Sequence, residues 1–258
     1  MKKNKGGIRH FVELLIEMTK KELLARYKNT FFGFLWLILN PILQMLVIGF
    51  IFRFIINEPI NFYFHHLFIG LLVWNFFSLS LTKATPSIVF ERSLIKKAYF
   101  RREIIPLSIV FSNFIHLLIA FVLFLFSIVF IGKLSILGIV LSIFSLLLLC
   151  IFTAGLSLLT SALNVRYRDV NFFVQALLIL WFYATPIVYS LNLIPGKLLW
   201  LWRFNPITSI LQFFQYGFLD GAPPGPAMIA SNVLVIFFTF ILGIIIFNKE
   251  SKYFDDWI

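Results

Sequence analysis

Six long apolar stretches that contain no Asp or Glu constrain how this chain can fold. They cover residues 31–56, 66–82, 104–131, 134–163, 170–191 and 228–247. Each is close to the ~20 residues that a helix needs to cross a bilayer, and in lipid only helices and closed barrels satisfy all their backbone groups. The sequence therefore predicts an all-α membrane protein with six transmembrane helices, built as one membrane domain over residues 1–258.

The basic residues are distributed asymmetrically between the two sides of the predicted membrane. Of the 22 Lys and Arg residues, 18 fall in the segments 1–30, 83–102, 164–169 and 249–258. Cytoplasmic loops carry an excess of Lys and Arg, so this distribution places both termini in the cytoplasm. The same topology, with attraction to anionic headgroups, accounts for the net charge of +11 without a nucleic-acid partner.

Residues 1–30 are expected to hold a cytoplasmic interfacial helix. Between residues 8 and 28, apolar side chains collect on one side of a helical wheel and most charged ones on the other, as in a helix that lies on a membrane. Glu22 and Arg26 interrupt the apolar side and sit four residues apart, which suits pairing with each other or with a partner. The helix is then either a plain lipid anchor or the flank of an entrance.

The chain offers little for catalysis or redox chemistry. All 11 Asp and Glu residues lie outside the predicted spans, whereas proton- and ion-driven transporters usually keep carboxylates inside the membrane. The one cysteine, Cys150, can form neither an internal disulfide nor a Cys-based metal site. The phosphate-binding loop G-x-x-x-x-G-K-[ST] is missing, so we expect no cofactor or metal in this chain, and any ATP that drives it binds to another chain.

Polar residues inside the predicted spans are sparse. Asn40-Pro41 predicts a kink in the first span, because proline removes a backbone hydrogen bond. His116 is the only titratable base deep in a span, and a structural or water-facing role competes there with a functional one. Small residues such as Thr153-Ala154-Gly155 serve packing within one subunit as well as between two, so they locate no dimer contact.

The loop between the second and third spans, residues 83–103, is predicted to form a short amphipathic helix. Apolar residues alternate there with charged ones, among them Glu91, Arg92, Lys96 and Lys97. One interpretation is a solvated basic loop on the cytoplasmic side. The other is a rigid lever that docks on a cytoplasmic partner, with its charges setting the register. The residues alone do not separate the two.

The external segment 192–227 is too apolar for a solvated loop and is expected to re-enter the outer leaflet as two short helices. Asn205 and Pro206 are typical of a helix start, with Asn as the N-cap and Pro at the first helical position. The second helix then carries Phe213 and Phe214. Such helices at the outer mouth of a bundle suit an exit gate, and an interfacial cap against lipid is the alternative.

Five aromatic residues with polar tips point to a path for sugars. Aromatic faces stack on sugar rings, and an amphipathic ring inside the membrane needs a polar partner. The candidates are Trp36, Trp74, Trp181, Tyr183 and Tyr189. Anchoring at the membrane interface explains Trp36 and Tyr189 equally well, because both lie near the ends of predicted spans.

Five motifs occur in a fixed order along most of the chain. They are Arg26-Tyr27-Lys28 with Gly33-Phe34-Leu35-Trp36 and Asn40-Pro41, then 94–100 (LIKKAYF), 164–170 (NVRYRDV), 185–189 (TPIVY), and Asn205-Pro206. In this order the chain resembles the membrane permeases of type-2 ABC exporters of polysaccharides, the Wzm-like group of O-antigen and teichoic-acid exporters. One departure is Arg101-Arg102-Glu103, where the family commonly has Pro-Arg-Glu.

The resemblance implies a homodimer of six-span subunits in the inner membrane, with two ATP-binding subunits that also hold the ATP and magnesium. Those subunits would dock mainly on residues 83–102 and also on Arg166, Arg168 and Asp169. The implied cargo is a lipid-linked polysaccharide, whose pyrophosphate would meet Arg26 and Lys28 while the glycan passes the aromatic side chains.

Two alternatives remain at this point. The same fold could export a small hydrophobic drug or a lipid. A pore or a secondary transporter that works without a partner is the other, and the acid-free spans speak against its ion-coupled form. If the cargo is a glycan, the sequence does not distinguish an O antigen from a capsule polysaccharide or a wall polymer.

Overall fold

The computed structural model describes residues 7–27, 35–52, 60–97, 99–191, 194–197, 200, 202 and 204–257. Throughout these residues the regular secondary structure is helical and contains no strand, which confirms the all-α prediction. A helix satisfies its backbone hydrogen bonds internally, as a lipid environment requires.

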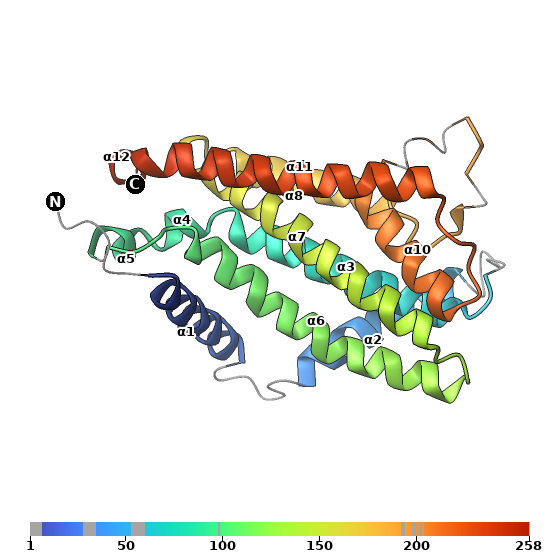
Figure 1. Cartoon of the computed structure of the whole chain (residues 1–258). Helices are drawn as coiled ribbons and strands as arrows, with labels where there is room; N and C mark the ends of the chain where they lie inside the picture. The colour runs from blue at the N-terminus through green and yellow to red at the C-terminus, as the bar shows by residue number, and fades with distance from the viewer. Residues whose placement is uncertain are drawn as a thin grey trace.

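Four helices in the described part of the chain are long and apolar enough to cross a membrane. They are α3 (Tyr63–Ala84), α6 (Ile104–Phe130), α7 (Ile136–Arg166) and α11 (Pro226–Glu250). At 1.5 Å per residue, even α3 extends roughly 33 Å, which exceeds a hydrocarbon layer of about 30 Å. The four run along the length of the molecule, and α7 contacts each of the other three (Figure 1).

Two further apolar helices are shorter than the spans predicted for them. α2 (Leu35–Phe50) contains Pro41 and extends roughly 24 Å, and α8 (Val170–Tyr183) extends roughly 21 Å. Residues 28–34 and 53–59, which flank α2, lie outside the described residues, so six spans remain a prediction. The fifth apolar stretch continues to residue 191, but α8 ends at Tyr183, because Pro186 disfavours the helical conformation of the residue before it.

The segment that follows α8 leaves the helical conformation but stays inside the protein. Thr185, Pro186, Ile187 and Val188 are all buried. Gly70 of α3 makes room for this segment, since a Cβ atom there would lie 2.9 Å from Cγ2 of Ile187. The Tyr63 hydroxyl donates a hydrogen bond to the Val188 carbonyl at 3.0 Å. Irregular backbone is tolerated at membrane depth when protein covers it in this way.

Two pairs of glycines let α7 touch its neighbours backbone to backbone. A Cβ atom on Gly155 would lie 2.5 Å from Cα of Phe240 in α11, and Gly243 of α11 lies against the Gly155 carbonyl. A Cβ atom on Gly217 of α10 would lie 2.7 Å from Cα of Gly138 near the start of α7. Gly155 therefore packs within the subunit, which settles one of the two roles that its sequence context allowed.

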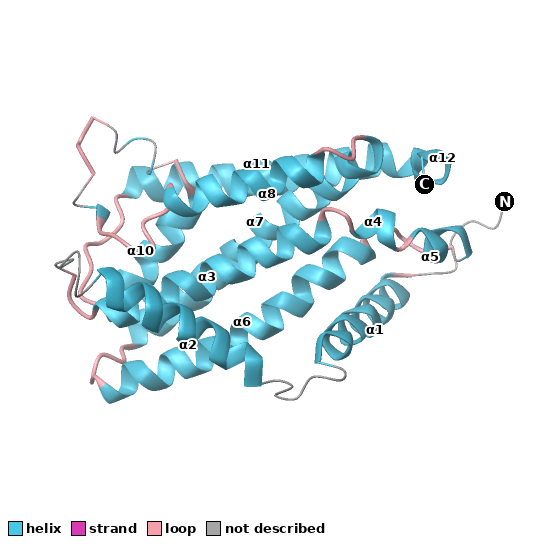
Figure 2. Ribbon diagram, turned by 180° about the vertical axis from the view of Figure 1, so that it is seen from behind, coloured by secondary structure: helices cyan, strands magenta, loops and turns pink. Residues whose placement is uncertain are grey.

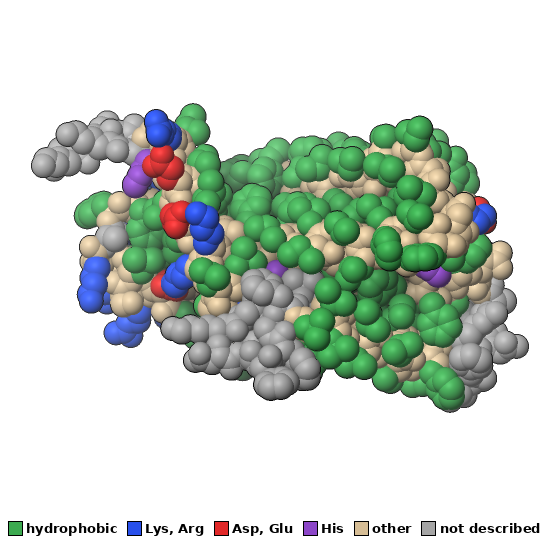
Figure 3. All heavy atoms as spheres, turned by 90° about the horizontal axis from the view of Figure 1, so that it is seen from below, with side chains coloured by type: hydrophobic (Ala, Val, Ile, Leu, Met, Phe, Trp, Pro, Cys, Tyr) green, Lys and Arg blue, Asp and Glu red, His purple; other side chains and the backbone are tan. Residues whose placement is uncertain are grey.

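The basic segments gather at one end of the bundle, where the N and C termini also lie (Figure 1). This end holds α1 (Ile8–Tyr27), α4 (Ser87–Phe90), α5 (Arg92–Lys97) and α12 (Phe254–Trp257). α1 is the predicted amphipathic N-terminal helix, and it packs against α6 with Met18 and Thr19 buried. In Figure 3, charged side chains crowd this end, while hydrophobic ones cover most of the rest of that face.

The helix predicted over residues 83–103 is divided in the structure. α3 continues to Ala84, and two short helices, α4 and α5, then flank Glu91. Pro86 explains the first break, because proline has no backbone N–H to continue the ladder of α3. The prediction of one amphipathic helix here was wrong in its length, although the segment is helical in part.

The opposite end of the bundle is closed by α10 (Pro206–Phe218). Asn205 caps it as predicted, accepting a hydrogen bond from the Ile207 N–H at 3.1 Å, and Pro206 begins the helix. Phe213 and Phe214 are buried, in edge-on contact with Phe144 of α7 and Phe121 of α6 respectively. The first of the two predicted external helices falls largely outside the described residues.

The glycine contacts of α7 yield a stability prediction. Gly155→Leu should destabilise the folded chain by about 1–3 kcal/mol or more, because the added side chain meets the backbone of α11. Thermal unfolding of the purified protein in detergent measures the effect. Gly196→Ala is the matched control, since no atom lies within 4 Å of a Cβ there. An unchanged unfolding temperature for Gly155→Leu would contradict this crossing of α7 and α11.

Candidate functional site

Two adjoining cavities run along one face of α3. The first has a volume of about 510 Å³ and lies between α3, α2, α6 and the end of α1; the second, about 610 Å³, lies between α3, α2 and α8. Asn75, Ser78 and Thr82 line both cavities. These positions are three and four residues apart, so they form a polar stripe on α3. Figure 2 shows α2 lying across α3 and α6, over this region.

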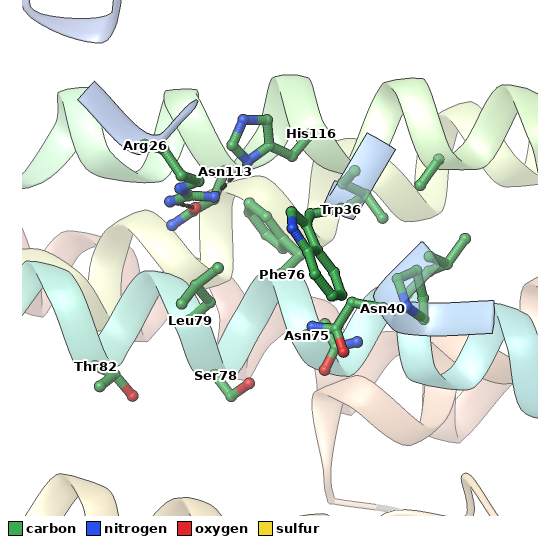
Figure 4. A pocket seen from close by; sticks show the side chains of 14 residues that line it. Arg26, Trp36, Asn40, Asn75, Phe76, Ser78, Leu79, Thr82, Asn113 and His116 are labelled. Carbon is green, nitrogen blue, oxygen red and sulfur yellow. Dashed lines mark hydrogen bonds between the residues drawn. The ribbon is translucent and has the colours of Figure 1, made fainter. Parts of the chain in front are cut away.

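The first cavity ends at a polar cluster that joins three helices. Arg26, in the last turn of α1, donates from Nη2 to Oδ1 of Asn113 at 2.6 Å, and its Nη1 contacts Nδ1 of His116. Asn113 Nδ2 in turn donates to Oγ of Ser80 on α3 at 3.1 Å. In Figure 4 the Arg26 side chain points toward Asn113 and His116.

A chain of amide side chains forms the boundary between the two cavities. Asn75 Nδ2 donates to Oε1 of Gln44 at 2.9 Å, and Gln44 Nε2 donates to Oδ1 of Asn40 at 3.4 Å. Asn40 and Asn75 lie next to each other beside the Trp36 ring in Figure 4. Each amide keeps further donor and acceptor positions, so this wall suits ligands that carry hydroxyl groups.

The five aromatic residues that were predicted to line the sugar path do not all lie in the same place. Trp36 lines the first cavity, whereas Trp74 and Tyr183 line the second. Trp74 is buried and meets Phe182 edge-on, with ring centroids 5.4 Å apart, while Tyr183 is 65% exposed. Three of the five aromatics therefore lie along the same face of α3.

Trp181 and Tyr189 lie away from these cavities. The Trp181 indole N–H donates to Oδ1 of Asn205 at 3.1 Å, next to a third cavity of about 440 Å³. The Tyr189 hydroxyl donates to the Tyr183 carbonyl at 2.7 Å and accepts from the Trp202 indole at 2.8 Å. Both side chains bind other parts of the protein, and the structure does not bring them together with Trp36 and Trp74.

Asn205 connects the end of α8 to the start of α10. Its Nδ2 donates to Oγ1 of Thr185 at 2.9 Å and to the Ala184 carbonyl at 3.2 Å, while its Oδ1 accepts from Trp181 and from Ile207 N–H. The two residues predicted as gate starts, Asn205 and Pro206, therefore hold α10 in place. This is a positioning role that the N-cap pattern alone did not reveal.

The predicted partner-contacting residues all lie at the basic end. On α5 and just before it, Lys96, Lys97 and Arg92 are exposed, while Glu91 pairs with Lys21 of α1 at 2.6 Å. Arg166, the last residue of α7, stacks on the Trp257 ring at 5.4 Å. In the loop that follows, Arg168 donates a hydrogen bond to the Trp257 carbonyl, and Asp169 directly precedes α8. Lys28, the second predicted entrance base, lies outside the described residues.

Sequence reasoning missed the partners that complete the polar walls. The sequence analysis did not single out Asn113 or Gln44, and it left the role of His116 open between a structural and a functional one. Their signal was a polar side chain inside an apolar helix, which predicts a partner without identifying it. The chemistry assembled here consists of amides, hydroxyls, aromatic rings and one guanidinium. Within the described residues, no group of three His, Cys, Asp or Glu side chains could hold a metal ion.

Comparison with known proteins covers nearly the whole chain. Residues 13–219 match the ABC-2 type transporter family. Two proteins named O-antigen export system permease protein RfbA, from Klebsiella pneumoniae, are 34% and 35% identical to this chain, each over 98% of both chains. A protein of the same name from Myxococcus xanthus is 34% identical over 86% of this chain and 88% of its own length. The residues that line the two cavities fall inside the family match.

The hydrogen bonds of Asn205 generate a second stability prediction. Asn205→Ala should destabilise the protein by about 2–4 kcal/mol, because it removes a helix cap worth about 1 kcal/mol and leaves the Trp181 N–H without its acceptor at about 1–3 kcal/mol. Asn205→Ser, which can still cap Ile207 but is too short for Trp181, should give an intermediate loss. Thermal unfolding in detergent ranks the three proteins. Equal stability of all three would contradict the connecting role.

Proposed function

Because the chain belongs to the ABC-2 type transporter family, we propose that it is the permease subunit of an ABC exporter that moves a lipid-linked polysaccharide of the O-antigen type out of the cytoplasm. The observation that carries this proposal is the similarity to the two Klebsiella O-antigen export permeases over 98% of both chains. A relationship at this length covers the whole membrane domain, including the cavities and the segments at the basic end.

The chemistry of the α3 face supports a glycan as the cargo. Asn75, Ser78 and Thr82 offer amide and hydroxyl groups in a row, and Trp36 and Tyr183 place aromatic rings beside them. Sugars bind to such surfaces through hydrogen bonds from their hydroxyls and through stacking of their apolar ring faces. In this proposal the glycan passes along α3, with Trp74 as part of the wall.

ATP hydrolysis is assigned to a separate subunit, which also holds the ATP and magnesium. We place the contact with that subunit at α4 and α5 and at Arg166, Arg168 and Asp169, all at the basic end. Lys96 and Lys97 are exposed there and available to acidic groups of a partner. Two copies of the chain and two ATP-binding subunits form the proposed complex.

The proposed topology has six crossings with both termini in the cytoplasm of the inner membrane. α2 and α8 supply two crossings beside the four long helices, and the buried segment after α8 extends the fifth. The basic end is then cytoplasmic, in line with the excess of Lys and Arg in its loops. α10 lies at the external end, where we propose that it closes the path.

A bulky side chain on the polar stripe should block export. Ser78 lines both cavities, so Ser78→Trp places an indole where they meet. In cells whose own gene is deleted, this variant should lower surface glycan at least tenfold, while lipid-linked glycan accumulates inside. Electrophoresis of surface polysaccharide against total lipid-linked glycan measures the change.

The matched control for this experiment is Leu234→Trp on α11. Leu234 is 70% exposed and lines none of the cavities described here, so its replacement should leave export near normal. Full surface glycan from a folded Ser78→Trp protein would refute a path along α3. If deletion leaves surface glycans intact and sensitises cells to drugs, the cargo is a small hydrophobic molecule instead.

Charge reversal at the basic end should separate the chain from its ATP-binding partner. Lys96→Glu with Lys97→Glu is expected to reduce co-purification of that partner from native membranes, and the associated ATPase activity, at least fivefold. Mass spectrometry of the purified complex identifies and quantifies the partner. Lys197→Glu, outside the basic segments, is the control and should retain both. Undiminished partner binding by the double variant would remove α5 from the proposed contact.

A further inference from the structure

We infer that residues 251–257 hold two separate partner-contacting segments in one fixed relative position. The first docking segment consists of α4, α5 and residues 99–102, and the second of residues 166–169. Residues 251–257, called the hook, form the short 3-10 helix Ser251–Tyr253 and α12, directly after α11. In Figure 1, α12 lies at the basic end of the bundle, as α4 and α5 do. The inference rests on the proposed function only for the identity of the partner.

Phe254 fixes the hook in the apolar core of the basic end. Its side chain is fully buried, and it meets Phe247 of α11 edge-on, with ring centroids 5.5 Å apart. Phe254 belongs to one buried cluster with side chains of the first docking segment and of the helices next to both segments. These include Ile88 of α4, Ile95 of α5, Ile104 of α6 and Val165 of α7. Burial of apolar surface therefore keeps the hook against both docking segments.

Arg102, at the end of the first docking segment, binds the hook through its guanidinium. Nη1 donates a hydrogen bond to the Ser251 carbonyl, and Cζ lies 6.0 Å from the centre of the Phe254 ring. Ser251 is the C-cap of α11, and the last carbonyls of a helix lack partners within it and carry partial negative charge. A guanidinium suits this position, because it is always charged and its planar group also stacks on rings.

The second docking segment is attached to the hook through Trp257. Arg166 Cζ lies 5.4 Å from the centre of the Trp257 ring, and Arg168 donates from Nη2 to the Trp257 carbonyl at 3.5 Å. Among aromatic rings, an indole attracts a cation most strongly. Tyr253 stacks with the Trp257 ring, with centroids 5.4 Å and planes 27° apart, and so restricts the indole to one orientation.

The hook therefore contacts both docking segments, which lie far apart in the sequence. A partner that binds two separate segments loses affinity when it must order them on binding, and loses less when the chain has already ordered them. Phe254 and Trp257 are thus positioning residues. They act on the contact with the ATP-binding subunit through Arg102, Arg166 and Arg168 and do not themselves have to touch the partner.

Distance measurements on the purified chain test whether the hook orders the two segments. Spin labels on Lys96→Cys and Asp169→Cys, both at exposed positions, report their separation in a chain that also carries Cys150→Ala. Electron paramagnetic resonance should give a narrow distance distribution. Trp257→Ala should widen it at least twofold, because Arg166 loses the ring on which it stacks. Trp257→Phe, which keeps an aromatic face, should restore most of the narrow distribution.

Co-purification tests whether this order serves the partner. In the unlabelled chain, Trp257→Ala should reduce recovery of the ATP-binding partner from native membranes, and the associated ATPase activity, at least threefold. Trp257→Phe should restore both. Phe254→Leu keeps an apolar side chain in the core but removes the ring next to Arg102, so it should give a smaller loss. Mass spectrometry quantifies the partner in each complex.

Lys252→Gln is the matched control, because Lys252 is an exposed residue of the same hook. It should leave the distance distribution and partner binding unchanged. Thermal unfolding in detergent checks that each variant is folded. If Trp257→Ala is unfolded, Trp257→Leu takes its place, since it removes the ring and keeps an apolar side chain.

The inference is overturned if folded Trp257→Ala keeps the narrow distance distribution, whatever its partner binding, because Trp257 would then not position the segments. It is also overturned if the distribution widens while partner binding and ATPase activity stay at the wild-type level. If the wild-type chain recovers no ATP-binding partner, the proposed function fails instead. The distance measurement contains no partner, so it still decides whether the hook orders the two segments.

Discussion

Close contact between backbones on α7 is what the rest of this bundle depends on. Lipid tails are as apolar as leucine, so helices in a membrane associate through close packing and hydrogen bonds rather than through burial of apolar surface alone. Gly155 and Gly138 bring α11 and α10 onto α7, and α3 and α6 pack on it as well. With α3 fixed against α6 and α7, its polar stripe at Asn75, Ser78 and Thr82 remains on the side that faces the cavities.

The sequence predicts a helix well where a single local feature, such as the length of an apolar run or an N-cap, determines it. Apolar runs of sufficient length gave α3, α6, α7 and α11, and the Asn205-Pro206 pattern gave the start of α10, because N-capping depends on neighbouring residues only. It predicts less well where a proline competes with an apolar run. Pro186 follows the end of α8 at Tyr183, although the apolar stretch continues to residue 191, and Pro86 divides the helix predicted over 83–103.

In the candidate site, too, the sequence predicts what depends on neighbouring residues and misses what depends on contacts between distant segments. Arg26 and Trp36, which were singled out by residue type, line the first cavity, whereas Trp181, singled out in the same way, donates a hydrogen bond to Asn205 instead. The neighbours that a helix face meets follow from packing, and packing is set by contacts such as that of Gly70 with Ile187. Asn113 and His116 meet Arg26 across about ninety positions of sequence, and no periodicity within one helix contains that information.

The polar groups that line the cavities suit a surface that binds a passing polymer only weakly. A surface that conducts a polymer must bind each unit well enough to admit it and weakly enough to release it. Asn75 already donates a hydrogen bond to Gln44, and Asn113 donates one to Ser80. A passing hydroxyl group therefore exchanges with existing hydrogen bonds and does not bind to an unsatisfied polar group. The full charge of Arg26 lies at one end of the first cavity, on the side of α1, while the amides and hydroxyls beyond it are neutral. Under the proposed function, the glycan therefore meets only weak, exchangeable contacts at these neutral groups.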